Sequence, residues 1–506
     1  MLRKITVHAV LLLAVVLLPG CGAGLRPEAS GHGSSGPVEF IILQMNDIYE
    51  LTPVSGGREG GLARVAAVRK ELLVENPNTV TVLGGDLFSP SALGTAMVDG
   101  KSLAGRQMVA VMNLLGLDYA TFGNHEFDLG ERDFLDRLAE SGFTWISANV
   151  FDRHGRPFPG VVDRKIIELE DGGGRTVRLG LFGLTVPANR KEYVSYADPL
   201  ETARAMVKAL RPEVDVLAAL THLPVDDDIA LAAGVPGIDL IVGGHEHENI
   251  QLWRGAGFVP VFKADANART LYVHRLAVDP DSGGITIRSE LRRVTDRDRA
   301  DPTVGAEVER WQEAGFAAFR RQGFDPEQVA AVIPEPLDGL ESSVRNRPTN
   351  LASLIARSLR AAVPGAELAF YNSGAVRIDD VLPAGPLTQY DIIRILPFGD
   401  RICEAVIDGS LLRRVLDQGQ KNRGSGGFLQ AAGAVRDGQG AWLINGEPLD
   451  DNRTYRAAVN DFLLSGREGN LAFFSQSSPL VQSQCIEQSD MRRVFGDYLA
   501  RQYGRH

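Results

Sequence analysis

The chain is poor in cysteine, in basic clusters and in repeats. Its 506 residues include three cysteines, none in a CxxC pair or near a Cys/His pair, which excludes a cysteine zinc site. There is no basic run and the formal net charge is −11, so we expect no nucleic acid polymer as a partner. Binding of a small phosphate ester remains compatible with this negative charge, because bound cations and a few local arginines outweigh the diffuse electrostatic field of the whole protein. Long polar blocks and internal repeats are also absent, and the 44% hydrophobic content is typical of a globular protein.

The first residues predict export. Arg3 and Lys4 precede an uncharged apolar stretch over residues 5–18, which is too short for a membrane-spanning helix. The ending Leu18-Pro19-Gly20-Cys21 resembles the cleavage box of bacterial lipoproteins, which would make Cys21 the lipidated first residue of the mature protein. The alternative is a plain secretory peptide cut nearby. We therefore expect a signal peptide over residues 1–21 and an exported lipoprotein, periplasmic or at the cell surface, held to the membrane by its N-terminal lipid.

The rest of the chain divides into a tether and two α/β halves, since 506 residues exceed what one core can hold. Residues 22–37 are rich in glycine and serine and predict a flexible tether. Residues 38–300 alternate strands with helical periods, and the turn at 171–174 joins two strands, so the sheet must be partly antiparallel. Residues 301–325 predict a linker helix, and residues 326–506 predict a second α/β domain. In that domain lie Cys403 and Cys485, which an exported protein could pair.

Five apolar runs in the first half end at residues that bind divalent metals or move protons. Such runs predict buried parallel strands, and open α/β sheets place ligands beyond the carboxyl ends of their strands. We therefore expect the end residues to share one sheet edge: Asp47, Asp86, Asn124 with His125, His222, and His245 with His247. A lone histidine is more often structural, and we assign no ligand role to His32 in the tether, His154 in a turn or His274 within a strand.

This set of residues predicts a pair of metal ions. Mixed nitrogen and oxygen ligands suit manganese, iron or zinc better than calcium, and six or seven ligands exceed the needs of one zinc. Asp86 is our candidate for the bridging carboxylate. Two such ions, divalent or of mixed valence, would bind a phosphoryl oxygen and supply hydroxide for in-line attack. His125 and Asp128 stand three residues apart, so the carboxylate could orient an imidazole that stabilises the transition state or protonates the leaving group.

The blocks MNDIY, GGD, GNHEFD, TH and GGHEH, in this order, resemble the calcineurin-like metallophosphatases, specifically the bacterial 5'-nucleotidases. The resemblance implies a four-layer α/β/β/α sandwich for residues 38–300. It further implies one metal site at Asp47, Asp86 and His247, a second at Asp86, Asn124, His222 and His245, and a catalytic dyad of His125 with Asp128.

The first block departs from the family pattern Asp-x-His, because Tyr49 stands where histidine is expected. One interpretation keeps Tyr49 as a phenolate ligand that favours trivalent iron. The other, which we prefer, removes Tyr49 from the metal, weakens that site and makes activity dependent on an added divalent cation.

The second half, through NSGAVR, LPFGD, GGFLQAAG and VNDFLLSGREGN, resembles the C-terminal nucleotide-binding domain of the same family. By position the resemblance implies polar substrate contacts from Arg345, Asn372 and Arg377. It implies that Phe398 and Phe462 clamp a base, and it places Glu468 where aspartate usually binds the ribose hydroxyls. Without the resemblance, core packing of the two phenylalanines and solvated or ion-paired arginines would be equally good interpretations.

The predicted function is therefore metal-dependent release of phosphate from 5'-nucleotides or nucleotide-like phosphoesters. One alternative keeps the same metals and acts on 2',3'-cyclic nucleotides or nucleotide-sugar diphosphates. Another is a non-catalytic binding lipoprotein. The family further implies that rotation between the domains carries the substrate to the metals.

Overall fold

The computed structural model describes residues 36–504; the predicted signal peptide, Cys21 and the tether up to residue 35 lie outside them. Two six-stranded sheets form the first half. The first has the order β16-β15-β1-β2-β5-β6, with β1 (Val38–Met45), β2 (Thr79–Leu83), β5 (Tyr119–Ala120), β6 (Thr144–Trp145), β15 (Thr270–Val278) and β16 (Ile285–Arg293). The second has the order β13-β14-β12-β11-β9-β8, with β8 (Arg164–Glu170), β9 (Thr176–Thr185), β11 (Val216–His222), β12 (Leu240–Gly243), β13 (Ile250–Arg254) and β14 (Val259–Lys263).

The strands that carry the predicted site are parallel within each sheet. Strand β2 pairs in parallel with β1 and β5, and β11 pairs in parallel with β12 and β9. The expectation of one shared edge is wrong, because β1, β2 and β5 belong to the first sheet whereas β11 and β12 belong to the second. The turn predicted at 171–174 does join two antiparallel strands, β8 and β9.

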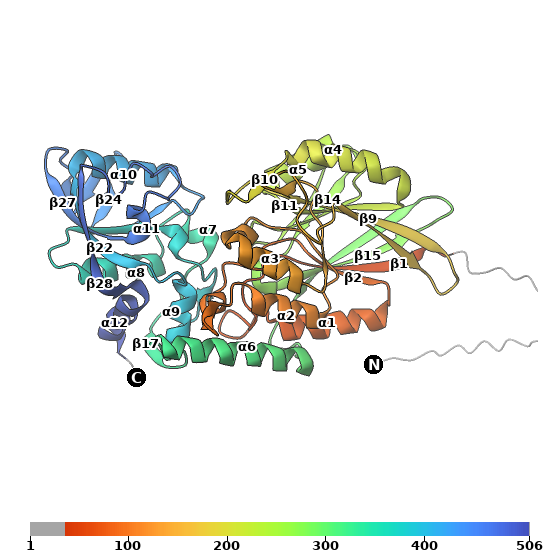
Figure 1. Cartoon of the computed structure of the whole chain (residues 1–506), viewed down its shortest axis with the longest axis horizontal. Helices are drawn as coiled ribbons and strands as arrows, with labels where there is room; N and C mark the ends of the chain where they lie inside the picture. Colours follow the sequence, from red (N-terminus) through yellow and green to blue (C-terminus); the bar gives the residue numbers. More distant parts are fainter. Residues whose placement is uncertain (1–35, 505–506) are drawn as a thin grey trace, which may run out of the picture. The chain divides into compact units, whose positions relative to one another are not determined.

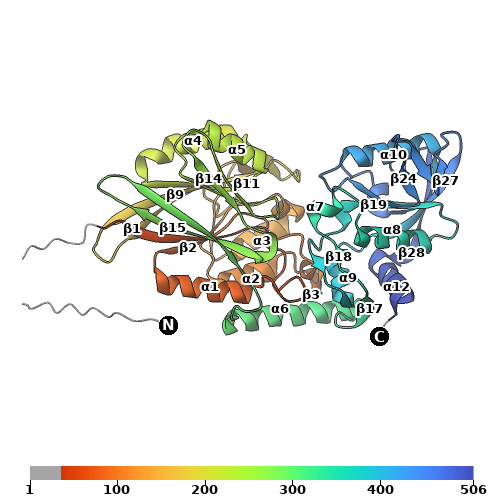
Figure 2. The ribbon, with the colours of Figure 1, turned by 180° about the vertical axis from the view of Figure 1, so that it is seen from behind.

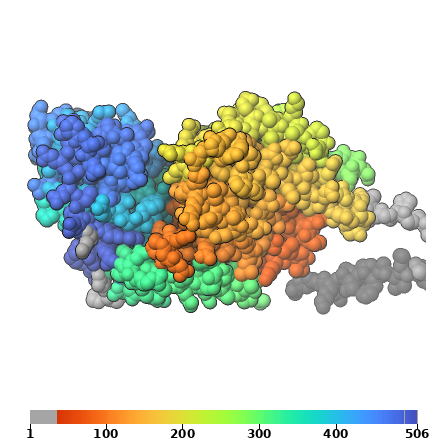
Figure 3. Space-filling view, viewed as in Figure 1, coloured from red at the N-terminus to blue at the C-terminus, as the bar shows by residue number. Residues whose placement is uncertain are grey.

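The two sheets face each other between two layers of helices. Figures 1 and 2 show α1 (Leu62–Glu75), α2 (Arg106–Leu115) and α6 (Pro302–Arg321) on one side, and α4 (Pro199–Leu210) and α5 (Val225–Gly234) on the other. Helix α3 (Glu131–Glu140) packs against α2. The outer face of α4, with Glu201, Arg204 and Lys208, is exposed (Figure 3). This is the predicted four-layer α/β/β/α sandwich.

Strand β1 shows why the buried strands have uninterrupted apolar runs. Phe40 and Ile42 lie in the core between the two sheets, and Ile41 and Leu43 lie in the core under the helices. Successive side chains of a strand point to opposite faces, and both faces are covered here. Helix α6 adds Val304, Val308 and Trp311 to the same helical core. None of the helices within residues 36–504 is long and apolar enough to cross a membrane.

The second half is built on a five-stranded sheet with the order β23-β19-β27-β22-β28. Its strands are β19 (Leu368–Asn372), β22 (Arg401–Asp408), β23 (Leu429–Ala432), β27 (Thr454–Asn460) and β28 (Val481–Asp490). Its helices are α7 (Glu341–Val344), α8 (Asn350–Ala362), α9 (Gln389–Ile395), α10 (Gly409–Lys421), α11 (Asp461–Leu464) and α12 (Met491–Tyr503). Alternating side chains of β19 enter two cores: Tyr371 packs with α8 and α12, and Phe370 packs with α10. The predicted second α/β domain is thus present.

Short strands complete the fold. They pair as β3 (Met97–Val98) with β4 (Lys101–Ser102), β7 (Val150–Asp152) with β10 (Val194–Tyr196), β17 (Val329–Ile333) with β21 (Gly385–Thr388) and β18 (Leu337–Asp338) with β20 (Val381–Leu382). Strands β24 (Ala434–Arg436), β25 (Trp442–Ile444) and β26 (Glu447–Pro448) form a small sheet.

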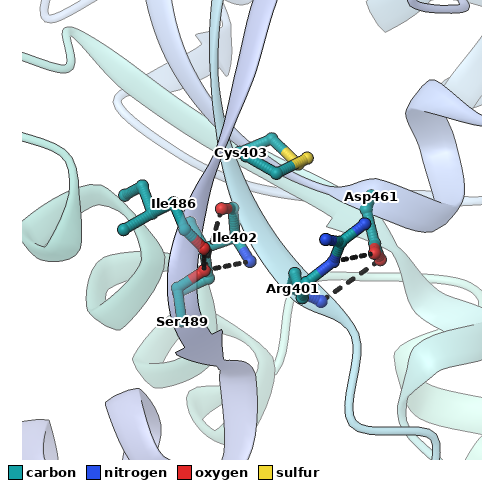
Figure 4. The surroundings of a disulfide bond; sticks show 7 residues. Arg401, Ile402, Cys403, Asp461, Ile486 and Ser489 are labelled. Atoms are coloured by element: carbon teal, nitrogen blue, oxygen red, sulfur yellow. Dashed lines mark hydrogen bonds and ion pairs between the residues drawn. A yellow bond between two sulfur atoms is a disulfide. The ribbon is translucent and has the colours of Figure 1, made fainter.

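A disulfide between Cys403 and Cys485 joins β22 to β28 (Figure 4). Beside it the pairing of the two strands shifts register after Arg401. The Ser489 Oγ accepts from the Ile402 amide there at 3.1 Å, and its single proton is shared by the carbonyls of Ile486 at 2.7 Å and Ile402 at 3.0 Å. The disulfide thus joins the edge strand β28 to β22 next to this irregular point.

Candidate metal centre and substrate site

The ends of five strands from two sheets bring the predicted ligands together. One atom each of Asp47, Asp86 and His247 lie within 4.8 Å of one another. The Nε2 atom of His222 lies 3.4 Å from Asp86 Oδ2, and the Nδ1 atom of His245 lies 3.4 Å from that same His222 nitrogen. Residues far apart in the sequence therefore converge on one buried cluster.

The backbone at these strand ends is unusual. Asp47, Asp86, His245 and His247 have φ values of 54°, 60°, 97° and 62°, in a region that residues other than glycine seldom adopt. Such conformations are typical of functional sites, where surrounding contacts compensate for the strain. Here the carboxylates supply part of that compensation: Asp47 Oδ2 accepts from the His245 amide and Asp86 Oδ1 accepts from the His125 amide, both at 2.9 Å.

The chemistry of the donor set fits two divalent cations. Asn124 Oδ1 is buried without a hydrogen-bond partner among the described residues, which is costly unless a cation or water uses that oxygen. Burial would raise the pKa of Asp86, but His222 and His125 hold it below its usual range, so the carboxylate is charged. Burial lowers the pKa of His245 well below its usual value, so that imidazole is neutral. Burial opposes the charged form of His222 and His247 as well, but Asp86 and Asp47 raise the pKa of His222 to about 9, and Glu341 and Asp379 raise that of His247 to about 10. A cation bound there would displace the protons of these two imidazoles.

Tyr49 lies at the centre of the cluster. Its hydroxyl donates to Asp86 Oδ2 at 2.7 Å and lies 3.0 Å from His247 Nε2. Burial, together with the charges of Asp86 and Asp47, raises the pKa of Tyr49 well above its usual value. The Tyr49 hydroxyl therefore lies within hydrogen-bond distance of two predicted ligands, Asp86 and His247.

The two residues of the predicted dyad, His125 and Asp128, are in direct contact. His125 and Asp128 begin and end a single 3-10 turn, and His125 Nδ1 lies 2.7 Å from Asp128 Oδ2. Burial would raise the pKa of Asp128, but His125 lowers it, so Asp128 is a carboxylate that accepts the Nδ1 proton. This leaves Nε2 of the imidazole as the atom available for proton transfer or for stabilising charge.

Two buried charged residues that sequence reasoning missed hold the ligand loops. The carboxylate of Glu126 accepts hydrogen bonds from the amides of Asp86, Phe88 and Gly123 and so ties two loops together. The signal was the first acid of the block GNHEFD. Burial and the charge of Asp86 raise the pKa of Glu126 to about 7.

Lys263 is the second missed residue, and its side chain is only 1% exposed. Its ammonium donates to the carbonyls of Leu223 and Gly244, which adjoin His222 and His245, and forms ion pairs with Asp228 and Glu246. A lysine that ends an apolar strand was the only sequence signal for it.

Two of the predicted substrate residues of the second half line a pocket, and a third, Arg377, lies next to one of them. Phe398 and Phe462 line a cavity of about 490 Å³. Phe398 is 51% exposed, so it is not a core residue. The guanidinium of Arg377 lies 5.6 Å from the centre of the Phe398 ring, and its charge helps to lower the pKa of Asp128. Arg377 therefore connects the pocket with the dyad.

The remaining three predicted residues are Arg345, Asn372 and Glu468, and the charge of Arg377 acts on Arg345 and Glu468. Arg345 is ion-paired with Glu341 at 2.5 Å. Asn372 Oδ1 accepts from Asn460 Nδ2 at 2.9 Å, and Asn372 also bonds to Glu468. Burial raises the pKa of Glu468, while the charges of Arg377 and Arg345 oppose this shift. The predicted arginines, asparagine and glutamate thus share one electrostatic environment.

Comparison with known families agrees with this architecture. The calcineurin-like phosphoesterase model matches residues 40–249, and the model of the 5'-nucleotidase C-terminal domain matches residues 329–476. The chain belongs to the 5'-nucleotidase family. The family and the two-domain fold predicted from the motifs are therefore confirmed, as is the class of enzyme: a metallophosphatase that uses two divalent metals to hydrolyse nucleotide phosphoesters.

Relatives of this 5'-nucleotidase family member are distant in sequence. It is 26% identical to Protein UshA of Yersinia enterocolitica, over 92% of this chain and 91% of that protein. It is also 26% identical to the trifunctional nucleotide phosphoesterase protein YfkN of Bacillus subtilis, over 87% of this chain, and spans about a third (32%) of the length of YfkN. The crystal structure of a 5'-nucleotidase precursor from Thermus thermophilus has the same fold, with a TM-score of 0.74 and 24% identity over 92% of this chain and 98% of that chain.

Proposed function

We propose that the protein releases phosphate from 5'-nucleotides, with the base in the pocket of Phe398 and Phe462 and the phosphate at the dyad. The observation that carries this proposal is the position of Arg377, which lies 5.6 Å from the Phe398 ring and acts electrostatically on Asp128. A guanidinium in this position suits the anionic part of a ligand whose aromatic part stacks on phenylalanine.

The metal ligands are proposed to be Asp47, Asp86, Asn124, His222, His245 and His247. Two divalent cations bound by these residues would supply hydroxide near neutral pH and would neutralise the charge of the phosphoryl group. The remaining roles belong to side chains of the protein. Asp128 holds His125 with Nε2 free, either to protonate the leaving oxygen or to stabilise the charge that develops. Arg345 and Arg377 neutralise the phosphate, and Glu468 contacts the ribose hydroxyls.

Base stacking is proposed to be tolerant. Two aromatic faces provide about 1–3 kcal/mol per stacked base without selecting one base. Several nucleoside 5'-monophosphates should therefore be substrates with similar kcat/KM values.

The test is phosphate release by metal-reconstituted protein from AMP, ADP, UDP-glucose, and 2',3'- and 3',5'-cyclic AMP. We expect AMP to be the best substrate, and we expect His125→Ala and Asn124→Ala to lower its turnover at least about 100-fold. Preference for the cyclic or diphosphate substrates would refute the 5'-monoester proposal in favour of the alternative hydrolases. Absence of turnover from every substrate would support a binding protein.

We also propose that the protein is exported and anchored through a lipid on Cys21. The basic and apolar start of the chain supports this, and so does the disulfide between Cys403 and Cys485, because disulfides persist in oxidising compartments. Mass spectrometry of the mature N-terminal peptide should find a lipid-modified Cys21, and Cys21→Ala should move the protein from the membrane to the soluble fraction. An unmodified N-terminus at another residue would instead indicate a plain secretory peptide.

A further inference from the structure

We propose that Asn189 is a positioning residue of the His125–Asp128 dyad. Its side-chain amide fixes the Asp128 carboxylate, and through it the tautomer and direction of the His125 imidazole. This inference rests on the proposed function in that it assigns the dyad a part in turnover. It adds a residue that none of the sequence motifs contains.

The hydrogen bonds of Asn189 leave its amide with one orientation. Nδ2 donates to Asp128 Oδ1 at 2.9 Å and to the Asn124 carbonyl at 3.1 Å. Both partners are acceptors only, so the NH₂ group must face them and both of its hydrogens are used. The carboxylate is therefore held at Oδ1 by Asn189 and at Oδ2 by His125, and the Ser89 hydroxyl makes a longer contact with Oδ2 at 3.3 Å.

This arrangement also decides the tautomer of His125. Asn189 Nδ2 lies 3.3 Å from His125 Nδ1, but its hydrogens point to Asp128 and to the Asn124 carbonyl. Since Nδ1 gives its own proton to Asp128, it has no lone pair to offer Asn189. A carboxylate free to rotate would let the ring turn or take the other tautomer, and Nε2 would no longer be reliably the reactive nitrogen.

The loop that carries Asn189 is fixed to the second sheet. It follows β9, and the Val186 amide donates to the carbonyl of His222 at 2.8 Å. The Tyr196 hydroxyl donates to the Ala188 carbonyl, also at 2.8 Å. Asn189 has a φ of 49°, a left-handed conformation that asparagine tolerates better than most residues. The side-chain amide of Asn189 thus connects the loop after β9 of the second sheet with the dyad after β5 of the first sheet.

The test compares metal-loaded wild type with Asn189→Gly and Asn189→Asp, and uses Lys191→Ala as the control. Glycine accepts the positive φ without strain, and aspartate keeps the shape but lacks both donors. Lys191 is an exposed residue of the same loop. We expect both Asn189 variants to lower kcat for AMP by about 10- to 100-fold, the range for losing a hydrogen bond to a charged group, with KM and bound metal unchanged. Lys191→Ala should match wild type.

A double-mutant cycle separates positioning from general damage. If Asn189 acts through Asp128, adding Asn189→Gly to Asp128→Ala should change kcat by less than about twofold. A full additional loss in that background, or unchanged kcat in both single variants, would overturn the proposal. Loss of bound metal in the single variants would also overturn it, because it would assign Asn189 to the metal site.

A spectroscopic measurement distinguishes failure of this inference from failure of the proposed function. In histidine-labelled protein, NMR should show a protected Nδ1 proton on His125 that Asp128→Ala abolishes and that exchanges faster with water in Asn189→Gly. If wild type does not hydrolyse AMP yet the signal behaves in this way, the 5'-nucleotide proposal fails and the positioning role stands. An Nδ1 signal unaffected by Asn189→Gly contradicts the positioning role whatever the substrate.

Discussion

Replacing Lys263 by methionine should destabilise the protein strongly. The Lys263 side chain is 1% exposed and that of Asp228 is 0% exposed, at an N–O distance of 2.9 Å. Methionine fills much of the same volume but leaves Asp228 buried without its cation. Removing one partner of a buried ion pair costs about 3–5 kcal/mol. We therefore expect Lys263→Met to lower the free energy of unfolding by about that amount.

Urea denaturation of the metal-free protein measures the effect through the transition midpoint. The matched control is Lys165→Met, because Lys165 is exposed on β8 and should change stability by less than about 0.5 kcal/mol. The double variant Lys263→Met with Asp228→Leu should recover part of the loss, since an apolar pair can replace a buried ion pair, whereas Glu246 still lacks its cation.

Lys263→Met should also weaken metal binding, because the carbonyls next to His222 and His245 lose their shared donor. A loss of stability no larger than that of Lys165→Met would refute this account of Lys263. Failure of the double variant to recover any stability would refute the part of it that concerns the unpaired charge.

Three further predictions concern single side chains. Burial lowers the pKa of His274 from 6.5 to about 3 in the folded protein. Between these two pH values the unfolded chain binds a proton at His274 that the folded chain does not, so the free energy of unfolding falls as the pH drops below about 6.5. The loss by pH 4.5 is at most about 2.7 kcal/mol, and His274→Gln should remove this pH dependence in denaturant titrations; an unchanged slope would contradict it. Asp379 Oδ2 lies 3.0 Å from His247 Nδ1, so Asp379→Ala should weaken Mn²⁺ binding about 10- to 100-fold in calorimetry, and affinity within twofold of wild type would exclude this support. Tyr49→Phe should leave metal content and the visible spectrum unchanged; a purple charge-transfer band in wild type that the substitution abolishes would show that Tyr49 is a ligand.

The strand ends were predictable because they follow a local rule. Apolar runs that stop at Asp47, Asp86, His222 and His245 can be read from the sequence, and parallel strands place such ends together. The assignment of the strands to two sheets was not predictable, because an apolar run is equally suited to either sheet. The proximity of His222 to Asp86 therefore results from the packing of the two sheets, which a local sequence pattern does not reveal.

The supporting residues were harder to predict because their partners are distant in sequence. Lys263 bonds to carbonyls at 223 and 244, and Asn189 reaches Asp128 from another sheet. Asn189 follows the apolar end of β9 by four residues, so the strand-end rule could have found it. His274 illustrates the opposite case: its place within a strand predicts no ligand role, and its imidazole bonds only to Gln44 and Ser289 among the described residues.

The most direct test of the central claim is the metal content of the full chain. Protein reconstituted with manganese, iron or zinc and freed of excess ions should retain two equivalents per chain by elemental analysis, and Asn124→Ala or His222→Ala should reduce this number. Retention of no stoichiometric metal under any of these conditions, in protein that is folded, would contradict the claim that these strand ends form a two-metal centre.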